Sequence, residues 1–331
     1  MPELAESEGD AVLALGYAER RGWWARISGD RLFKLFTLTP TLVVLGLLIG
    51  ITAVLIWSAR DSIAKFGLHF VTSSDWDPVN DQFGALPFIY GTVVSSSIAL
   101  MIAVPLSLGV ALCLSEMAPR WLASRLAFLV ELLAAIPSVV YGLWGIFALG
   151  PFLSGRVEPV LARYLGFLPL FQGPRVSVSM LSAGVILAVM VIPFISAVST
   201  DVFSAVPANQ REAALALGAT RWEMVRIAVL PYGFLGVIGA IILGLGRALG
   251  ETIAVAMVIG NRPAISASLF MPASTLASVI ANEFAEATSD VYVSALLELG
   301  LVLLILGMLV NVIARLLVLR TMRHLFAGSG R

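Results

Sequence analysis

The sequence has few charged residues and very few of the side chains that build catalytic centres. Only 13% of its 331 residues are charged, about half the share in an average soluble protein. It contains one cysteine, which excludes an intrachain disulfide and argues against a cysteine-based metal cluster. The two histidines, His69 and His324, lie far apart in sequence. We expect Cys113 to be a small buried side chain, and no set of nucleophile, base and metal ligands supports a membrane enzyme.

Hydrophobic residues make up 59% of the chain, and the formal net charge is zero, so the composition gives no indication of nucleic-acid binding. A helix needs about 20 apolar residues to cross a bilayer. The sequence therefore predicts an all-α integral membrane protein with six transmembrane helices. The apolar runs of this length are residues 36–58, 91–115, 126–150, 178–199, 233–260 and 293–319.

The distribution of lysine and arginine predicts that both termini are cytoplasmic. With this orientation, the inner segments hold 14 of these residues and the outer segments hold six, as the positive-inside rule requires. Residues 1–35 then form a cytoplasmic N-terminal segment, residues 36–320 a transmembrane domain with a cytoplasmic loop at 200–232, and residues 321–331 a cytoplasmic tail. The N-terminal segment starts with acids and lacks the pattern of a cleavable signal peptide.

The last predicted outer loop contains a short amphipathic pattern, which predicts a helix on the outer surface. This helix could serve as a lid on the helix bundle or as a docking site for a partner. The apolar residues at helical spacing are Leu276, Val279, Ile280 and Phe284.

The loop PANQREAALALGATRWEMVRIAVLP, residues 207–231, predicts two short helices below the membrane. Asn209 is placed to cap the first helix, with Glu212 reaching back in a capping box. Gly218 is placed to end that helix in the left-handed conformation. A second helix over residues 222–229 then leads into the next span.

This loop resembles the EAA loop of ABC importer permeases, although Ala228 stands where isoleucine is usual. The resemblance implies a type I ABC importer permease fold, in which the loop seats in a groove of a cytoplasmic ATPase. The residues at the motif positions, expected to couple the chain to the ATPase, are Glu212, Ala213, Ala214, Gly218, Leu230 and Pro231.

The chain itself has no sequence for ATP binding. A P-loop requires a glycine-rich turn that ends in Gly-Lys-Ser/Thr, and neither lysine, Lys34 or Lys65, has this context. We therefore expect a non-catalytic permease subunit without a cofactor of its own. ATP and Mg would be bound by a separate ATPase.

Two further stretches resemble the permeases of the Pst phosphate importer: AAIPSVVYGLWGIFAL (residues 134–149) and GRALGETIAVAMVIGN (residues 246–261). The ending TIAVAMVIGN resembles the PstC-type subunit, and the resemblance covers most of residues 35–320. It implies a multi-pass protein of a bacterial or archaeal cell (inner) membrane. It also implies four partners: a PstA-like permease, two PstB-like ATPase subunits and a PstS-like phosphate-binding protein.

Arg247 and Glu251 are charged residues within the predicted span at 233–260. Each charge at the centre of a membrane helix costs about 2.5–3.5 kcal/mol on insertion scales, so such residues are candidates for function. A spacing of four predicts that both lie on one helix face. We expect Arg247 to hold phosphate oxygens and Glu251 to compensate its charge or to repel the anion. The alternative is an internal ion pair that fixes packing, with Glu131 or Glu298 as other partners of Arg247.

Two other functions fit parts of the sequence. A permease of the same architecture could carry another oxyanion, such as sulfate or molybdate. A secondary transporter or channel would need no ATPase, and the EAA-type loop argues against that class.

Overall fold

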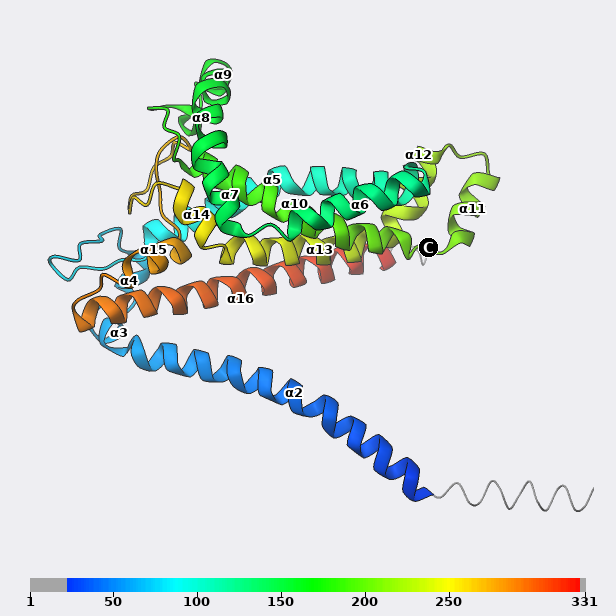
Figure 1. The fold of residues 1–331 in the computed structure, drawn as a ribbon, viewed down its shortest axis with the longest axis horizontal. Helices are drawn as coiled ribbons and strands as arrows, with labels where there is room; N and C mark the ends of the chain where they lie inside the picture. Colours follow the sequence, from blue (N-terminus) through cyan, green and yellow to red (C-terminus); the bar gives the residue numbers. More distant parts are fainter. Residues whose placement is uncertain (1–22, 328–331) are drawn as a thin grey trace, which may run out of the picture. The chain divides into compact units, whose positions relative to one another are not determined.

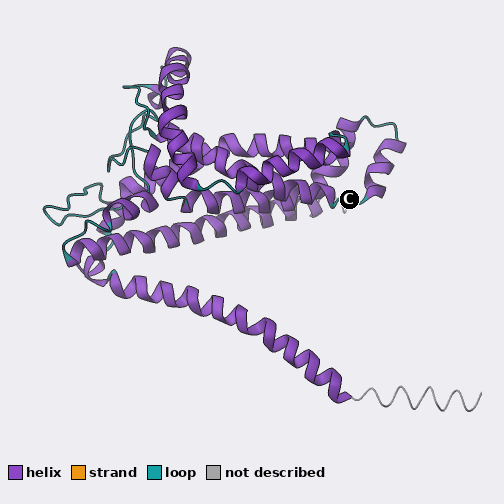
Figure 2. Cartoon of the chain, in the orientation of Figure 1, coloured by secondary structure: helices purple, strands orange, loops and turns teal. Residues whose placement is uncertain are grey.

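The computed structural model describes residues 23–327, and all regular secondary structure in that range is helical (Figures 1 and 2). The acidic start of the chain and the last four residues of the tail lie outside the described residues. The chain divides into two compact units, residues 1–57 and residues 58–331. The described part of unit 1 is the helix α2 (Trp23–Ser58) up to Trp57, and most apolar side chains of α2 from residue 31 onward are exposed.

Six helical stretches of the described chain are long and apolar enough to cross a membrane, which confirms the predicted number. The helix α2 starts at Trp23, well before the predicted residue 36, so the described helix begins inside the predicted N-terminal segment. The six stretches are Arg31–Ser58, Leu86–Met117, Ser138–Leu165, Met180–Ser204, Arg221–Gly250 and Asp290–Leu316.

The third stretch differs from the prediction of one helix over residues 126–150. The helix α6 (Arg120–Ala134) ends before Pro137, whose extended backbone leads into α7 (Ser138–Trp144). Proline removes an amide donor and disfavours a helical conformation in the residue before it. The predicted uninterrupted helix is therefore wrong, because a break at residues 135–137 divides it.

Unit 2 is built around α10 (Met180–Ser204), which packs between α5 (Leu86–Leu112) and α13 (Leu230–Gly250). Two-thirds of the apolar window of α10 is buried, more than in any other described span. Close approach of α13 depends on Gly244, where any Cβ would collide with Ile195 and Val191. Small residues of this kind allow the backbone contact that drives helix packing in membranes. The long helix α16 (Asp290–Ala327) packs beside α13.

Shorter helices and turns connect these spans. They are α3 (Arg60–Phe66), α4 (His69–Thr72), α8 (Gly150–Phe152), α9 (Glu158–Leu165), α11 (Ala208–Ala216), α12 (Arg221–Met224), α14 (Ile253–Val258) and α15 (Leu276–Glu283), the 3₁₀ turn η4 (Pro169–Phe171), and the π-helical turns η1 (Cys113–Met117), η2 (Gly145–Leu149), η3 (Leu153–Val157) and η5 (Val225–Val229).

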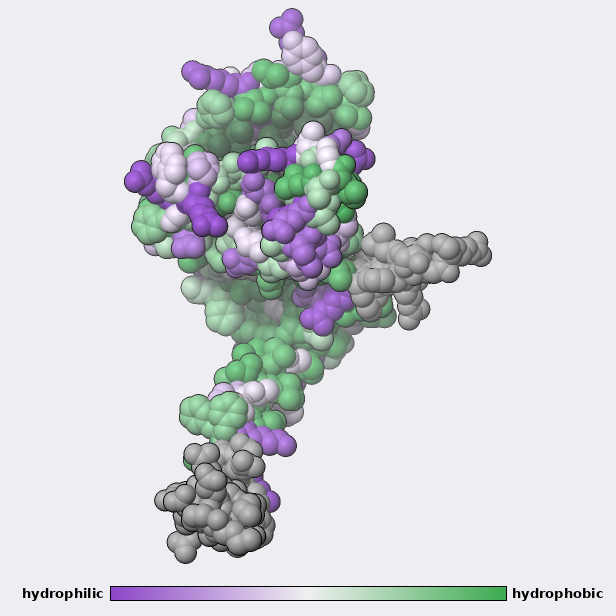
Figure 3. All heavy atoms as spheres, turned by 90° about the vertical axis from the view of Figure 1, so that its right-hand side faces the viewer, coloured by the Kyte–Doolittle hydropathy of each residue, from purple (hydrophilic) through white to green (hydrophobic). Residues whose placement is uncertain are grey.

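The loops of unit 2 gather at two opposite ends of the bundle (Figure 1). The end that carries α11 and α12, here the α11 end, also holds the junction of α5 with α6. The other end, the α15 end, holds α4, α14 and α15. Seen from the α11 end, hydrophilic residues gather on the end face and hydrophobic residues cover the flanks (Figure 3). This distribution agrees with the prediction that the loops lie at the two ends of a membrane-spanning bundle. The side of the membrane that each end faces stays a prediction.

The predicted amphipathic helix is present as α15, and its apolar face is buried against the bundle. Leu276 and Val279 are buried with residues of α5 and α16, whereas Phe284 is half-exposed. The carboxylate of Glu283 at its end accepts hydrogen bonds from Trp76 Nε1 (2.9 Å) and Tyr292 Oη (2.6 Å). These contacts favour the lid alternative.

Candidate translocation and coupling sites

Arg247 lies in the last turn of α13, with its guanidinium over an aromatic ring. Its Cζ is 4.2 Å from the centroid of the Phe194 ring in α10, a cation–π contact. Its Nε is buried and makes no hydrogen bond within the described part of the chain. Buried polar atoms of proteins are nearly always paired, so an unpaired donor requires an explanation. This geometry suits a side chain that binds an anionic group.

The structure contradicts the prediction that Arg247 and Glu251 share one helix face. The helix α13 ends at Gly250, Glu251 has an extended backbone (φ −71°, ψ 123°), and α14 begins at Ile253. Gly250 is a poor helix former. The Thr252 hydroxyl donates to the Gly250 carbonyl oxygen at 3.2 Å, and this local bond takes the place of the backbone hydrogen bond that a continuous helix would form there. Within the described residues, no ion pair joins Glu251 to Arg247.

The other two acids considered as partners of Arg247 also lie elsewhere. Glu298 is buried in α16, and Glu131 is exposed on α6. Neither forms an ion pair with Arg247 among the described residues. The internal ion pair that the sequence left open is therefore not formed.

The segments 134–149 and 246–261 pack against each other near Arg247. A Cβ on Gly142 of α7 would collide with Met257 of α14, and one on Gly145 would collide with Val258. The hydroxyl of Tyr141 donates to the Leu133 carbonyl oxygen at 2.7 Å. These contacts connect the break before α7 to α14, which follows Arg247 and Glu251 in the chain.

The first helix of the EAA-type loop, α11, is not capped as predicted. Pro207 is its N-cap and Asn209 lies inside the helix, so the side chain of Asn209 makes no capping bond. A capping box forms instead at α12, where Thr220 Oγ1 accepts from Glu223 N at 3.3 Å and Glu223 Oε2 accepts from Thr220 N at 2.8 Å. The predicted cap was wrong because Pro207, two residues before Asn209, supplies a preset φ at the start of the helix.

The end of α11 confirms the predicted conformation of Gly218. Its φ is +86°, and its N–H donates to the Leu215 carbonyl oxygen at 2.9 Å. The next amide, of Ala219, donates to the Ala214 carbonyl oxygen at 3.2 Å. These two bonds form a Schellman motif, which requires a left-handed residue and favours glycine.

The residues at the EAA positions divide between two faces of the loop. Ala214 is buried with Val225 of η5 and Phe203 of α10, so it fixes α11 to the bundle. Glu212 and Ala213 are exposed. Leu230 and Pro231 begin α13, where proline is compatible with the first turn. The exposed face is the one available to a partner.

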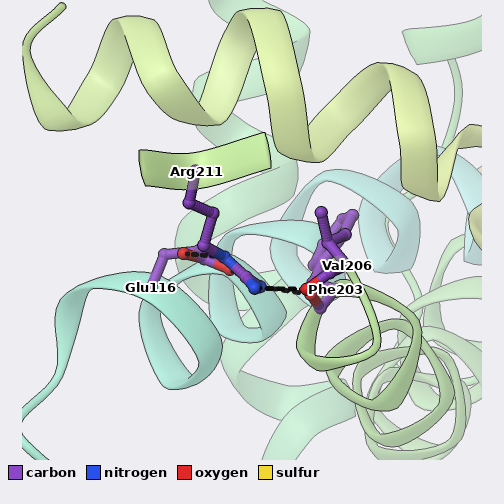
Figure 4. A network of polar contacts seen from close by, with 4 residues as sticks. All are labelled: Glu116, Phe203, Val206 and Arg211. Carbon is purple, nitrogen blue, oxygen red and sulfur yellow. Dashed lines mark hydrogen bonds and ion pairs between the residues drawn. The ribbon is translucent and has the colours of Figure 1, made fainter. Parts of the chain in front are cut away.

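A network at the α11 end was not predicted from the sequence (Figure 4). Arg211 of α11 donates from Nε to Glu116 Oε2 at 3.2 Å and from Nη2 to Glu116 Oε1 at 2.7 Å. It also donates from Nη2 to the Phe203 carbonyl oxygen at 2.6 Å, and from Nη1 to that of Val206. The one available signal was that Glu116 is the only acid between Asp81 and Glu131.

Comparison with known proteins gives two kinds of match. A family described as "Binding-protein-dependent transport system inner membrane component" matches residues 103–323. Proteins named "Phosphate transport system permease protein PstC" are 45% identical in Mesorhizobium japonicum (88% of this chain, 90% of the relative), 48% in Xylella fastidiosa (89% and 92%) and 45% in Haemophilus influenzae (87% and 93%). The chain belongs to the PstC family of binding-protein-dependent transport permeases.

Solved structures support the fold of this PstC-family chain. A chain of a bacterial alginate ABC transporter, in complex with a periplasmic protein that holds an alginate pentasaccharide, matches with a TM-score of 0.56 and 18% identity. The match covers 88% of this chain and 95% of that one. The type I ABC importer permease fold is thereby confirmed, and the chain is a multi-pass membrane protein of a transport system.

Cys113 is the remaining correction to the sequence analysis. It was expected to be buried, but it is exposed at the start of η1 in this PstC-family chain. A small apolar side chain on an outward helix face is compatible with lipid or with a partner helix.

Proposed function

We propose that this chain is a transmembrane permease subunit of an ATP-driven importer of inorganic phosphate. The observation that carries the proposal is Arg247, a guanidinium within a span whose buried Nε has no partner among the described residues. A guanidinium binds two oxygens of one phosphate in a planar, bidentate geometry. The relatives at 45–48% identity are named for phosphate transport, which favours phosphate over sulfate or molybdate.

The subunit would form the translocation path with a second, PstA-like permease. The exposed face of α11, including Glu212 and Ala213, would seat in a groove of one of two PstB-like ATPases. ATP and Mg would be bound by those subunits, and this chain would need no cofactor. A PstS-like protein would deliver phosphate to the α15 end.

The direct test is uptake by the purified, reconstituted complex. Proteoliposomes that contain all subunits, with ATP inside and the loaded binding protein outside, are expected to accumulate labelled phosphate. They should exclude labelled sulfate and molybdate supplied in the same way. Accumulation of either competitor without phosphate would reassign the substrate, and uptake without ATP would favour a secondary transporter.

The second prediction concerns Glu251, which is partly buried beside the break after α13. Because it has no ion pair with Arg247, we propose that its charge opposes the anion and promotes release. Glu251→Gln removes the charge with little change in shape. We expect tighter retention of phosphate and slower uptake with normal amounts of complex, measured as phosphate bound per purified complex and initial uptake rate. Reduced assembly with unchanged retention would contradict this function.

The third prediction tests the proposed orientation, with both termini cytoplasmic in a bacterial or archaeal cell membrane. In a Cys113→Ser background, Val79→Cys (92% exposed) and Asn282→Cys are placed at the α15 end, and Leu217→Cys (89% exposed) at the α11 end. We expect an impermeant maleimide to label the first two from outside intact cells and Leu217→Cys only in inverted vesicles. The opposite labelling pattern would reverse the orientation.

A further inference from the structure

The contacts of Arg211 join three separate parts of unit 2 at one side chain (Figure 4). The carboxylate of Glu116 belongs to the π-turn η1 at the end of α5, and the carbonyl of Phe203 belongs to the last turn of α10. The carbonyl of Val206 belongs to the turn that leads into α11. We call these four residues the Arg211 clamp.

The Arg211 clamp is shielded from water. The side chain of Arg211 is 21% exposed and that of Glu116 is 6% exposed. Solvent and salt therefore weaken this pair much less than an exposed one. A change that removes one partner leaves the other charge buried without compensation, which is costly.

Besides the Arg211 clamp, α11 contacts the bundle mainly at η5, which leads into α13. Ala214 is the one buried residue of α11 among the nine described. A single alanine provides little apolar contact, so the bidentate pair and the two carbonyl bonds supply most of the directional contacts of α11. Movement of α11 is therefore transferred to the end of α5 through Arg211, and to α10 both through Arg211 and through the connecting residues 205–207.

The position of Glu116 continues this connection through α6 toward α7 and α14. The π-turn η1 is followed by Ala118 and Pro119 and then by α6. Single π-turns are frequent at functional sites of helices. The far end of α6 accepts the hydrogen bond of Tyr141 of α7, and α7 packs against α14.

We propose that the Arg211 clamp is a positioning device that transmits movement of α11 to α5, α6 and α10, and so links ATP hydrolysis to substrate movement. This inference rests on the proposed function, because it requires an ATPase docked on α11. In this proposal, neither Arg211 nor Glu116 touches the substrate or the nucleotide. Their effect is on the stimulation of ATP hydrolysis by the loaded binding protein.

The test uses the complete complex in proteoliposomes and measures ATP hydrolysis with and without phosphate-loaded binding protein. We expect Arg211→Gln and Glu116→Gln each to lower the stimulated-to-basal ratio, by roughly the 5- to 150-fold typical of coupling between sites. Phosphate moved per ATP should fall in parallel. The double variant should be no worse than the worse single variant, because the two residues act on one contact. Arg211→Lys keeps the charge without the fork and should be intermediate.

The matched control is Arg120→Gln. Arg120 is an exposed arginine at the same end, four residues after Glu116, with no hydrogen bond or ion pair among the described residues. It should keep the wild-type ratio. A wild-type ratio in Arg211→Gln or Glu116→Gln, an equal loss in Arg120→Gln, or a loss that is wholly one of subunit assembly in every clamp variant would overturn the proposal.

Failure of the proposed function would give a different result. If loaded binding protein for another anion, and not for phosphate, stimulates the wild-type complex, the phosphate assignment fails. The clamp variants are then compared under that stimulus, with the same expected order. If no loaded binding protein stimulates the wild-type complex, both proposals are wrong.

Discussion

Replacement of Arg247 by glutamine is expected to reduce phosphate uptake per assembled complex by roughly ten- to 150-fold, since a hydrogen bond to a charged group contributes about 1.5–3 kcal/mol. Glutamine removes the charge while it retains much of the side chain's length. Arg247→Lys keeps the charge but cannot bind two oxygens in a fork, so partial activity is expected. Initial uptake rates, normalised to the amount of complex, give the measurement.

The control for Arg247 is Arg262→Gln, which removes an exposed arginine at the α15 end. It should transport normally. A structural arginine would give another pattern: less assembled complex in Arg247→Gln, and recovery when Glu251→Gln is added. Since no ion pair joins the two residues in the structure, we expect no such recovery. Normal uptake per complex in Arg247→Gln would end the substrate-contact hypothesis.

Replacement of Gly218 by valine is expected to uncouple uptake from ATP hydrolysis. A Cβ at this position would meet nothing within 4 Å, so the substitution creates no collision. The effect comes from φ, because a left-handed conformation costs an ordinary L-residue about 1–2 kcal/mol and is rarer still for a β-branched one. The Schellman end of α11 should then open and displace its exposed face.

The matched control is Gly218→Asn at the same position. Asparagine tolerates the left-handed conformation better than other residues with a Cβ, so Gly218→Asn should keep most of the uptake that Gly218→Val loses. A companion variant, Glu212→Arg, reverses a charge on the exposed face and should weaken co-purification of the ATPase. Equal uptake by the valine and asparagine variants would contradict the need for positive φ in the coupling loop.

The sequence was sufficient for the number of spans, because this number depends on local composition. It predicted Gly218 correctly for the same reason, since the need for positive φ is expressed in one residue. The break after Gly250 was missed because apolar residues continue on both sides of Glu251 and Thr252, so that one span was predicted. Hydropathy records which residues prefer the membrane, and it contains no information on where backbone hydrogen bonds stop.

The Arg211 clamp illustrates the other limit of sequence reasoning. Glu116 and Arg211 are 95 positions apart, and neither has a pattern of its own. Their pairing depends on how α5 and α10 bring two chain segments to the same end of the bundle. The cap of α11 was missed for a local reason, since Pro207 and not Asn209 stands at its N-cap. The capping box at Thr220 belongs to the next helix, α12, and was not predicted.

The end of α13 at Gly250 also bears on how long an anion stays bound. The last turn of a helix has unpaired carbonyl oxygens and a partial negative charge, worth about 0.3–1 kcal/mol to a nearby cation. Arg247, in that turn, is therefore partly neutralised by backbone rather than by a fixed carboxylate. The same carbonyls oppose a multiply charged anion bound to Arg247. We expect this to shorten the residence time of phosphate, which favours rapid turnover over tight storage.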